Sequence, residues 1–264
     1  MKPLYAVFGN PIAHSLSPII HQQFALQTGV SLCYKKIEVP LLQFEDVVTD
    51  FFKQGGKGLN ITLPFKERAN AMAHVQSPRA STAGAANMLW MEGGSLHADN
   101  TDGVGLIRDL QQHAIPLTHK TILLLGAGGA ARGIIGPLLQ ENPVSLTLAN
   151  RTFEKAQALQ QVFPTALICK LDELTHDYDL IINATSASFN DSDLLIPQVL
   201  FSNHPFCYDL AYGKNRTTPF VQKAKQLGCV AIDGTGMLIE QAAEAFFIWH
   251  GIRPNTLYCA RSQF

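Results

Sequence analysis

The chain has 264 residues, of which 47 % are hydrophobic and 16 % are charged. This length suffices for two domains, and the composition gives the chain no reason to be disordered. Twenty Lys and Arg against 21 Asp and Glu leave a formal net charge of −1. That balance argues against a nucleic acid or a membrane surface as the partner, because both call for a basic excess.

The five cysteines are scattered, odd in number and without a CxxC pair. This usage suits a reducing compartment and excludes the usual zinc spacings. No segment typical of a signal peptide precedes the first strand-like residues, and no apolar run is long enough to span a bilayer. We therefore expect a cytoplasmic protein without a metal site.

Short apolar runs alternate with helical patterns through the first hundred residues. The runs predict strands at 5–9, 34–39, 58–62, 88–92 and 95–98. Helical periodicity predicts helices at 18–27, 42–53 and 65–74. Ser17 before Pro18 is typical of a helix N-cap, and Gly29 suits the end of that helix.

From about residue 120 the strands become continuously apolar, which is typical of a parallel sheet with helices on both faces. We predict strands at 121–125, 145–149, 166–169, 179–183, 206–210 and 229–232. Helices are expected at 130–139, 153–162 and 218–227. This alternation predicts an α/β, doubly wound domain. Pro137 should kink the first of these helices or end it early.

A last helix is expected at 238–250 and should end at Gly251. Glu240 and Glu244 fall on the face opposite its apolar residues. The apolar face consists of Leu238, Ala242, Ala245, Phe246 and Trp249.

A glycine-rich segment follows the strand at 121–125. Gly126 permits a tight turn, Gly128 lets the backbone approach a pyrophosphate, and Ala131 is small enough for close packing of helix on strand. The helix that begins here offers unpaired N–H groups and a positive dipole end to phosphates. Strand, glycines and helix together predict a dinucleotide site.

The next strand ends in Asn150-Arg151-Thr152. NAD-binding domains usually place an acidic residue here, on the ribose 2′-hydroxyl. A neutral Asn followed by Arg instead favours a 2′-phosphate, which a guanidinium binds well. The cofactor expected from these residues is NADP.

Four polar clusters lie where strand-like segments meet a turn or helix, which is where open α/β sheets place ligands. They are residues 9–18, 60–66, 84–87 and 99–103. Each cluster also has a structural interpretation: Ser17 and Asp102 suit helix N-caps, Asn87 suits a turn, and Asn60 and Thr62 suit a strand end.

Lys66 fits a structural interpretation poorly, because a cation in the first turn of a helix opposes the helix dipole by ~0.3–1 kcal/mol. The same field favours release of a lysine proton. Reducing a carbonyl by hydride requires a proton donor at the new alkoxide. Lys66 with a carboxylate partner such as Asp102 supplies one.

Taken in order, these motifs resemble the shikimate dehydrogenase family over almost the whole chain. The matching segments read GNPIAHSLSPIIH, NITLPFK, GAANML, DNTDGVGL, LLLGAGGAARG, NRT, INATS, YDLAYG and DGTGMLIEQAAEAF.

The resemblance implies reversible NADPH-dependent reduction of 3-dehydroshikimate to shikimate, in aromatic amino-acid biosynthesis, by a monomer or homodimer. It implies a substrate domain with a mixed sheet at 1–102. A doubly wound parallel Rossmann NADP domain follows at 103–236, and residues 237–264 form a C-terminal helix that returns to the first domain.

The resemblance also assigns roles. Ser15 and Ser17 hold the substrate carboxylate, and Lys66 with Asp102 does the acid–base work. Other substrate-binding positions are Asn60, Thr62, Asn87, Tyr212 and Gln241. Cofactor-binding positions are Gly126, Ala127, Gly128, Gly129, Ala130, Asn150, Arg151, Thr152, Thr185, Ser186, Gly234 and Met237.

Three alternatives compete with this interpretation. An NAD-dependent quinate/shikimate dehydrogenase would carry an acid where Asn150 stands. A methylene-tetrahydrofolate dehydrogenase shares two domains and a catalytic lysine, but the serine pair fits a small carboxylate better than a folate. A non-catalytic NADP sensor would have no need of Lys66 and Asp102, and both are present.

Overall fold

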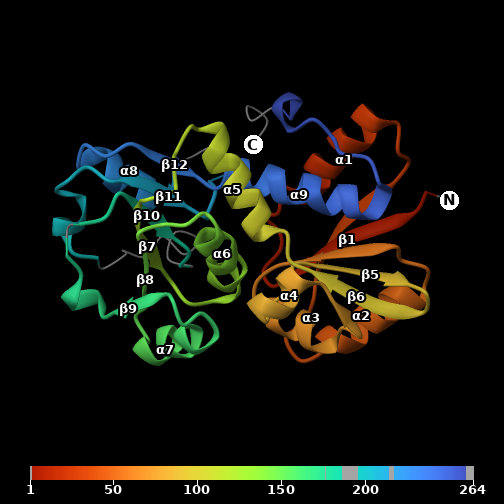
Figure 1. Ribbon diagram of the computed structural model, residues 1–264. Coiled ribbons are helices and arrows are strands. Elements are labelled where there is room, and N and C mark those ends of the chain that lie inside the picture. Colours follow the sequence, from red (N-terminus) through yellow and green to blue (C-terminus); the bar gives the residue numbers. More distant parts are fainter. Residues whose placement is uncertain (1, 176, 186–195, 214–216, 260–264) are drawn as a thin grey trace. The chain divides into compact units, whose positions relative to one another are not determined.

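The computed structural model describes residues 2–175, 177–185, 196–213 and 217–259. These residues form two compact units. Unit 1 contains the described residues up to Gly105 and those from Leu238 onward, and unit 2 spans Leu106–Met237. The described part of each unit contains one six-stranded sheet, covered by helices on both faces (Figure 1).

Unit 1 has the mixed sheet expected for the first domain. Its strand order is β2-β1-β3-β5-β6-β4, with β1 parallel to β2 and β3, and β5 antiparallel to β3 and β6. Its elements are β1 (Leu4–Gly9), α1 (Ser17–Thr28), β2 (Cys33–Glu38), α2 (Phe44–Lys53), β3 (Gly58–Ile61), α3 (Lys66–Met72), β4 (Val75–Gln76), α4 (Pro78–Ala83), β5 (Met88–Glu92), β6 (Ser95–Asp99), most of α9 (Thr235–His250) and the 3₁₀ helix η4 (Thr256–Tyr258).

Alternate residues of β1 face opposite sides of this sheet. Ala6 and Phe8 pack in a cluster with residues of α2, α3 and α4. Tyr5 faces the other side, where its ring lies 4.9 Å from that of Trp249 in α9. Phe246 of the same helix packs on Phe24 of α1. The C-terminal helix therefore packs on the first domain, as predicted.

Unit 2 has the doubly wound parallel sheet predicted from the sequence. Its strand order is β12-β11-β10-β7-β8-β9, so the chain reverses its direction of winding between β7 and β10. Its elements are most of α5 (Asp102–Gln112), then β7 (Thr121–Leu125), α6 (Gly129–Gln140), β8 (Ser145–Ala149), α7 (Phe153–Val162), β9 (Leu167–Cys169), η1 (Leu171–Glu173), β10 (Leu180–Asn183), η3 (Gln198–Phe201), β11 (Phe206–Asp209), α8 (Pro219–Gln226) and β12 (Ala231–Asp233).

Strand β7 explains why the sequence of this sheet is continuously apolar. Ile122 and Leu124 enter a cluster with α5, α6 and α7, whereas Leu123 and Leu125 enter a second cluster with α8 and η3. Both faces of the strand are buried, so neither can be polar. Ligands of such sheets bind beyond the carboxyl ends of the strands, at the reversal between β7 and β10.

Several local details differ from the predictions. Helix α6 continues through Pro137 to Gln140, so of the two effects predicted for this proline, a kink or an early end, the early end was wrong. The strand β4 and the short helix α4 were not predicted. The prediction of Ser17 as the N-cap was wrong, because Ser17 is the first residue of α1 and Leu16 occupies the N-cap position. The backbone N–H of Ser17 donates to the hydroxyl oxygen of Ser15 at 3.4 Å. The Ser17 hydroxyl instead accepts a hydrogen bond from the hydroxyl of Ser15 at 3.3 Å.

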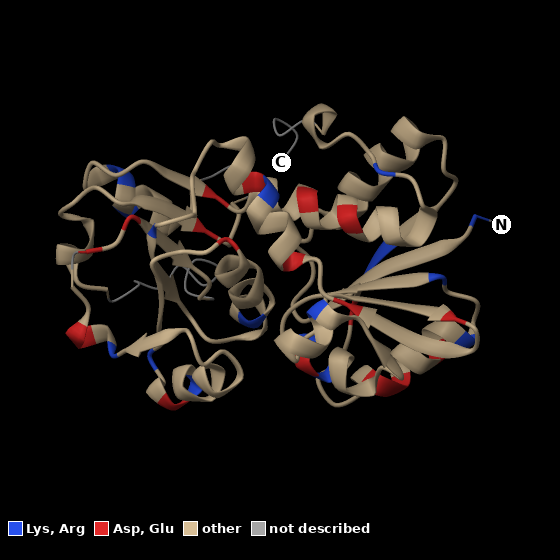
Figure 2. Cartoon of the chain, viewed as in Figure 1, with Lys and Arg blue, Asp and Glu red and all other residues tan. Residues whose placement is uncertain are grey.

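The prediction that Glu240 and Glu244 lie on a polar outer face of α9 was also wrong. Figure 2 shows acidic residues along α9, but Glu240 and Glu244 are only 5 % and 7 % exposed. The Glu244 carboxylate accepts hydrogen bonds from Arg79 and Arg253. A buried carboxylate requires such partners, and the periodicity of one helix cannot reveal cations that come from elsewhere in the chain.

Candidate functional site

A buried ion pair joins the two predicted catalytic residues. Lys66 is the first residue of α3 and Asp102 the first of α5. The Lys66 Nζ lies 2.5 Å from Oδ2 of Asp102, and the two side chains are 13 % and 7 % exposed. A carboxylate suits the first turn of a helix, and it also offsets the unfavourable position of the lysine cation in its own helix. The pair can hold or deliver one proton in a largely dry setting.

Asn87 connects this pair to the C-terminal helix. It follows α4 and precedes β5, and it is 2 % exposed. Its Nδ2 donates to Oδ1 of Asp102 at 2.8 Å and to Oε1 of Gln241 at 3.2 Å. Its Oδ1 accepts the backbone N–H of Thr101 at 2.9 Å. The amide is therefore fixed in one orientation beside the Asp102 carboxylate.

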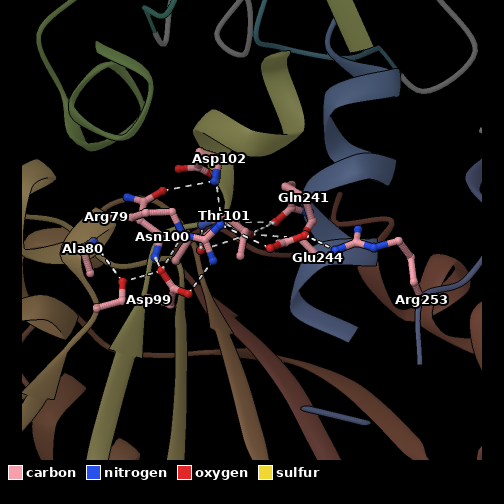
Figure 3. Close-up of polar contacts among 11 residues, drawn as sticks. Arg79, Ala80, Asp99, Asn100, Thr101, Asp102, Gln241, Glu244 and Arg253 are labelled. Atoms are coloured by element: carbon pink, nitrogen blue, oxygen red, sulfur yellow. Dashed lines mark hydrogen bonds and ion pairs between the residues drawn. The ribbon is translucent and has the colours of Figure 1, made fainter. Parts of the chain in front are cut away.

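Thr101 forms a second bridge to α9. Its hydroxyl donates to the main-chain oxygen of Gln241 at 3.0 Å, and Figure 3 shows both residues beside Asp102. No role was predicted for Thr101, which is fully buried. Its position inside the Asp99–Asp102 cluster is the sequence signal that could have identified it.

Asn60 and the paired serines belong to the same unit and are linked by Tyr34. The Tyr34 hydroxyl donates to Oδ1 of Asn60 at 2.7 Å, and Ser17 forms a hydrogen bond with the same phenol. Burial raises the pKa of Tyr34 well above its usual value, so the phenol stays protonated and remains a donor. The Asn60 Nδ2 donates to the main-chain oxygen of Asn87 at 3.3 Å. Tyr34 is a contributor that the sequence patterns did not identify.

Thr62 lies between β3 and α3 and is half-buried. Its backbone oxygen accepts from the N–H of Phe65, so the residue forms the turn that leads directly to Lys66. A chain of hydrogen bonds therefore links several predicted polar residues of unit 1 to the Lys66–Asp102 pair, and Thr62 lies in the turn before Lys66. The linked residues are Ser15, Ser17, Asn60, Asn87 and Gln241.

The glycine-rich segment of unit 2 has the geometry of a phosphate loop. Gly126 has φ +111°, and a Cβ there would lie 2.9 Å from the backbone of Ala184. Apart from neighbouring backbone, no atom of the described residues lies within 4 Å of the place where a Cβ of Gly128 would be. Helix α6 begins at Gly129, and Ala131 is fully buried. Ala127 and Ala130 complete this loop. The open space in front of a helix N-terminus fits a pyrophosphate.

The end of β8 carries the residues predicted to select NADP. Asn150 donates from Nδ2 to the main-chain oxygen of Thr152 at 2.8 Å, and Arg151 is exposed. Thr152 occupies the N-cap position of α7 but makes no side-chain capping bond. These residues follow the strand next to the phosphate loop, and none is acidic.

The loop after β10 is held by a polar network that was not predicted. Thr185 donates its hydroxyl to Oδ1 of Asn183 at 2.7 Å, and Nδ2 of Asn183 donates to Asp209 at 3.0 Å. The other oxygen of Asp209 accepts from Thr218 at 2.7 Å. All four belong to unit 2. The predicted cofactor residue Ser186 lies outside the described residues.

The remaining predicted positions lie near the end of β11 and the start of α9. Tyr212 follows β11 and is half-buried. A Cβ on Gly234 would lie 2.3 Å from the main-chain oxygen of Leu210, so only glycine fits. Met237 is 7 % exposed and belongs to the core cluster of unit 2.

Two further functions find no support among the described residues. No group of three or more His, Cys, Asp or Glu side chains in this part of the chain is placed to hold a metal ion. No helix there is both long enough and apolar enough to cross a bilayer.

Comparison with protein-family models gives three matches along the chain. Residues 7–89 match the shikimate dehydrogenase substrate binding domain. Residues 109–193 match the shikimate / quinate 5-dehydrogenase model, and residues 234–259 match the shikimate 5′-dehydrogenase C-terminal domain.

Individual proteins agree with these models. The chain is 57 % identical to the shikimate dehydrogenase (NADP(+)) of Legionella pneumophila (strain Lens), over 96 % of this chain and 95 % of that protein. The crystal structure of an Ael1 enzyme from Pseudomonas putida matches with a TM-score of 0.91 and 43 % identity, covering 99 % and 98 % of the two chains. Shikimate 5-dehydrogenase from Thermus thermophilus, in complex with NADP(H) and shikimate, matches with a TM-score of 0.88 and 32 % identity, covering 97 % and 96 %.

Proposed function

Since the chain belongs to the shikimate dehydrogenase family, we propose that it catalyses the reversible NADP-dependent reduction of 3-dehydroshikimate to shikimate, with Lys66 and Asp102 as its acid–base pair. The observation that carries the assignment of roles is the Lys66–Asp102 ion pair at 2.5 Å, held by Asn87. We further propose that unit 1 is the substrate domain and unit 2 the NADP domain.

In the reduction, the carbonyl oxygen of the substrate gains negative charge and needs a proton. In this proposal the Lys66 ammonium hydrogen bonds this oxygen and delivers the proton as the alcohol forms. Asp102 and the carboxamide of Asn87 fix the position of Nζ, so little reorganisation is required during the reaction. In the reverse direction the same pair accepts the proton of the shikimate hydroxyl.

The other polar groups of unit 1 suit a small polyhydroxylated acid. Ser15 and Ser17 present two hydroxyls 3.3 Å apart, a spacing suited to the two oxygens of one carboxylate. Asn60, Asn87 and Gln241 offer amide groups to substrate hydroxyls. Tyr34 and Thr101 orient two of these amides in advance, which lowers the entropic cost of ordering them on binding.

Unit 2 fits NADP on its own geometry. The glycine-rich loop and the start of α6 would hold the pyrophosphate, and Arg151 with Asn150 and Thr152 would hold the 2′-phosphate. Bound NADPH supplies the hydride of the reduction. All five cysteines are free, which supports a reducing compartment, the cytoplasm. We propose a monomer or a homodimer.

A spectrophotometric assay tests this function. Purified protein should reduce NADP with shikimate as substrate, and should do so much more slowly with NAD. The family model also covers quinate dehydrogenases, so quinate is the substrate to compare. Turnover of quinate equal to that of shikimate would refute the substrate assignment, and no turnover with either cofactor would refute the activity.

A further inference from the structure

A second set of charges, two buried carboxylates and two partly exposed arginines, lies in unit 1 and takes no part in the proposed chemistry. Arg79, in α4, donates from Nε and Nη2 to the two oxygens of Asp99, at 3.0 and 2.6 Å. Its Nη1 donates to Oε1 of Glu244 at 3.2 Å. The other oxygen of Glu244 accepts from Arg253. Figure 3 shows that this network joins α4, the end of β6 and α9.

Asp99 links Arg79 to Asp102 through a chain of hydrogen bonds. Its Oδ1 accepts the backbone N–H of Asn100 at 2.7 Å and also binds the hydroxyl of Ser77. The side chain of Asn100 then accepts the backbone N–H of Asp102 at 3.1 Å. Asp99 and Asp102 are each 5 % exposed and Asn100 is 2 % exposed. Two consecutive turns of the chain are thus fixed, by groups that do not touch Lys66.

Glu244 binds Arg79 to α9, the helix that also carries the predicted substrate-binding residue Gln241. It lies one helical turn after Gln241, so the two side chains point in similar directions. Gln241 accepts hydrogen bonds from Asn87 and Thr101, and Glu244 forms an ion pair with Arg79. Helix α9 is therefore tied at two neighbouring points to residues that also set Asp102.

We propose that Arg79 is a positioning residue that acts through Asp102. It holds the loop from β6 to α5 by binding Asp99, and it holds α9 by binding Glu244. The inference rests on the proposed function, in which Asp102 partners the catalytic lysine. Arg79 itself reaches none of the reacting groups.

The chemistry of the contacts requires arginine at this position. One side chain engages both oxygens of Asp99 and a third oxygen of Glu244, which needs the planar fork of a guanidinium. Burial alone would lower the pKa of Arg79, but the hydrogen bonds and charges of Asp99 and Glu244 outweigh it and raise that pKa. A lysine would keep the charge and lose the fork. Arg79→Lys therefore separates geometry from charge.

The matched control is Arg253→Lys. Arg253 binds the same carboxylate of Glu244, but no hydrogen bond from it to Asp99 is found among the described residues. We expect Arg79→Lys to lower kcat for shikimate by ~10–100-fold, the loss that a misplacement of about 1 Å produces. Arg253→Lys should stay within about twofold of wild type. The KM for NADP should not change in either variant.

A double-mutant cycle with Asp102→Asn separates positioning from general stability. If Arg79 acts through Asp102, then Arg79→Lys should add less than about twofold to the loss already caused by Asp102→Asn. A purely structural residue would lower kcat by the same factor in both backgrounds. That result, or wild-type kcat in Arg79→Lys, would overturn the inference.

A crystal structure of Arg79→Lys gives a readout that does not depend on turnover. We expect a displaced loop from Asp99 to Asp102 and a lengthened contact between Lys66 and Asp102. A loop and contact unchanged from wild type would overturn the inference, even if the wild-type protein fails to oxidise shikimate. Absence of wild-type turnover with a displaced loop in the variant would refute the proposed function and leave the positioning role standing.

Discussion

The candidate sites of the two units are built in opposite ways. In unit 1, side chains bind side chains: Lys66, Asp102, Asn87 and Gln241 form one buried hydrogen-bonded group. In unit 2, the phosphate loop offers backbone, and the side chain expected to select the cofactor, Arg151, is exposed. The first site is a network of side chains that hold one another in place. The second site consists of a backbone loop and an exposed cation, Arg151.

This difference fits the tasks that we propose for the units. A proton donor must be held against a reacting oxygen within a fraction of an ångström, and buried hydrogen bonds supply that restraint. A dinucleotide phosphate carries full charges, so a helix N-terminus and one flexible cation suffice to bind it. Substitutions in unit 1 should therefore act on turnover, and substitutions in unit 2 on cofactor affinity.

The largest effect is expected from Lys66→Ala. Loss of the proton donor should lower kcat by ~10²–10⁴-fold, because positioned acid–base groups contribute that much. The affinity for NADPH, measured by fluorescence titration, should change by less than about twofold. Lys53→Ala, which removes an exposed lysine of the same unit, is the control. A rise in the KM for shikimate with kcat unchanged would make Lys66 a binding group.

The same contrast explains how much of the molecule could be predicted from sequence. The bounds of the strands of unit 2 were predicted to within two residues, and its glycine loop was located, because the signals are local: apolar runs and turn glycines. The sheet of unit 1 was also predicted, although β4 and α4 are too short to show a periodicity.

The interior of the unit 1 site could not be predicted in this way. Glu244 was assigned to an outer face because Arg79 is 165 positions away in the chain, and no local pattern links them. Tyr34 and Thr101 were missed for the same reason: their hydrogen bonds join elements far apart in the chain. The roles given to Ser15 and Ser17 came from family resemblance, which draws on whole structures.

Cofactor selection is the next largest expected effect. Arg151→Ala should weaken NADPH binding by ~10–100-fold, since a charge-assisted hydrogen bond contributes about 1.5–3 kcal/mol. Binding of NADH, which has no 2′-phosphate, should change by less than about twofold. Lys225→Ala removes an exposed cation of α8, a different helix of the same unit, and should leave both affinities intact. Equal weakening of NADPH and NADH would refute the proposed 2′-phosphate contact.

Acid stability should distinguish the units as well. His21 lies behind the unit 1 site, fully buried, with its ring stacked 4.2 Å from that of Tyr34. Burial, with a contribution from the nearby His250, lowers its pKa to about 3. Below pH 6.5 the His21 side chain binds a proton in the unfolded chain but not in the folded chain. The free energy of unfolding therefore falls as the pH drops from 6.5 towards 3. At pH 5 the loss should be about 2 kcal/mol.

Urea unfolding at pH 8 and pH 5 measures this effect. His21→Gln should flatten the dependence of the unfolding free energy on pH by about 2 kcal/mol, whatever its effect at pH 8. His204→Asn replaces an exposed histidine of unit 2 whose φ of +50° asparagine tolerates, and it should leave the pH dependence unchanged. An unaltered slope in His21→Gln would mean that another group controls acid unfolding.

The smallest effect is expected at the serine pair, and it marks the limit of the contrast between the units. Ser15 and Ser17 are side chains of unit 1, yet we propose that they bind the carboxylate and take no part in proton transfer. Ser15→Ala should raise the KM for shikimate by ~10-fold, the lower end of the range for one hydrogen bond to a charged group, with kcat within about twofold. Ser31→Ala, an exposed serine of the same unit, should have no effect. If Ser15→Ala lowered kcat and left KM unchanged, the pair would belong to the proton-transfer group, and unit 1 would hold a single cooperative site with no separate binding part.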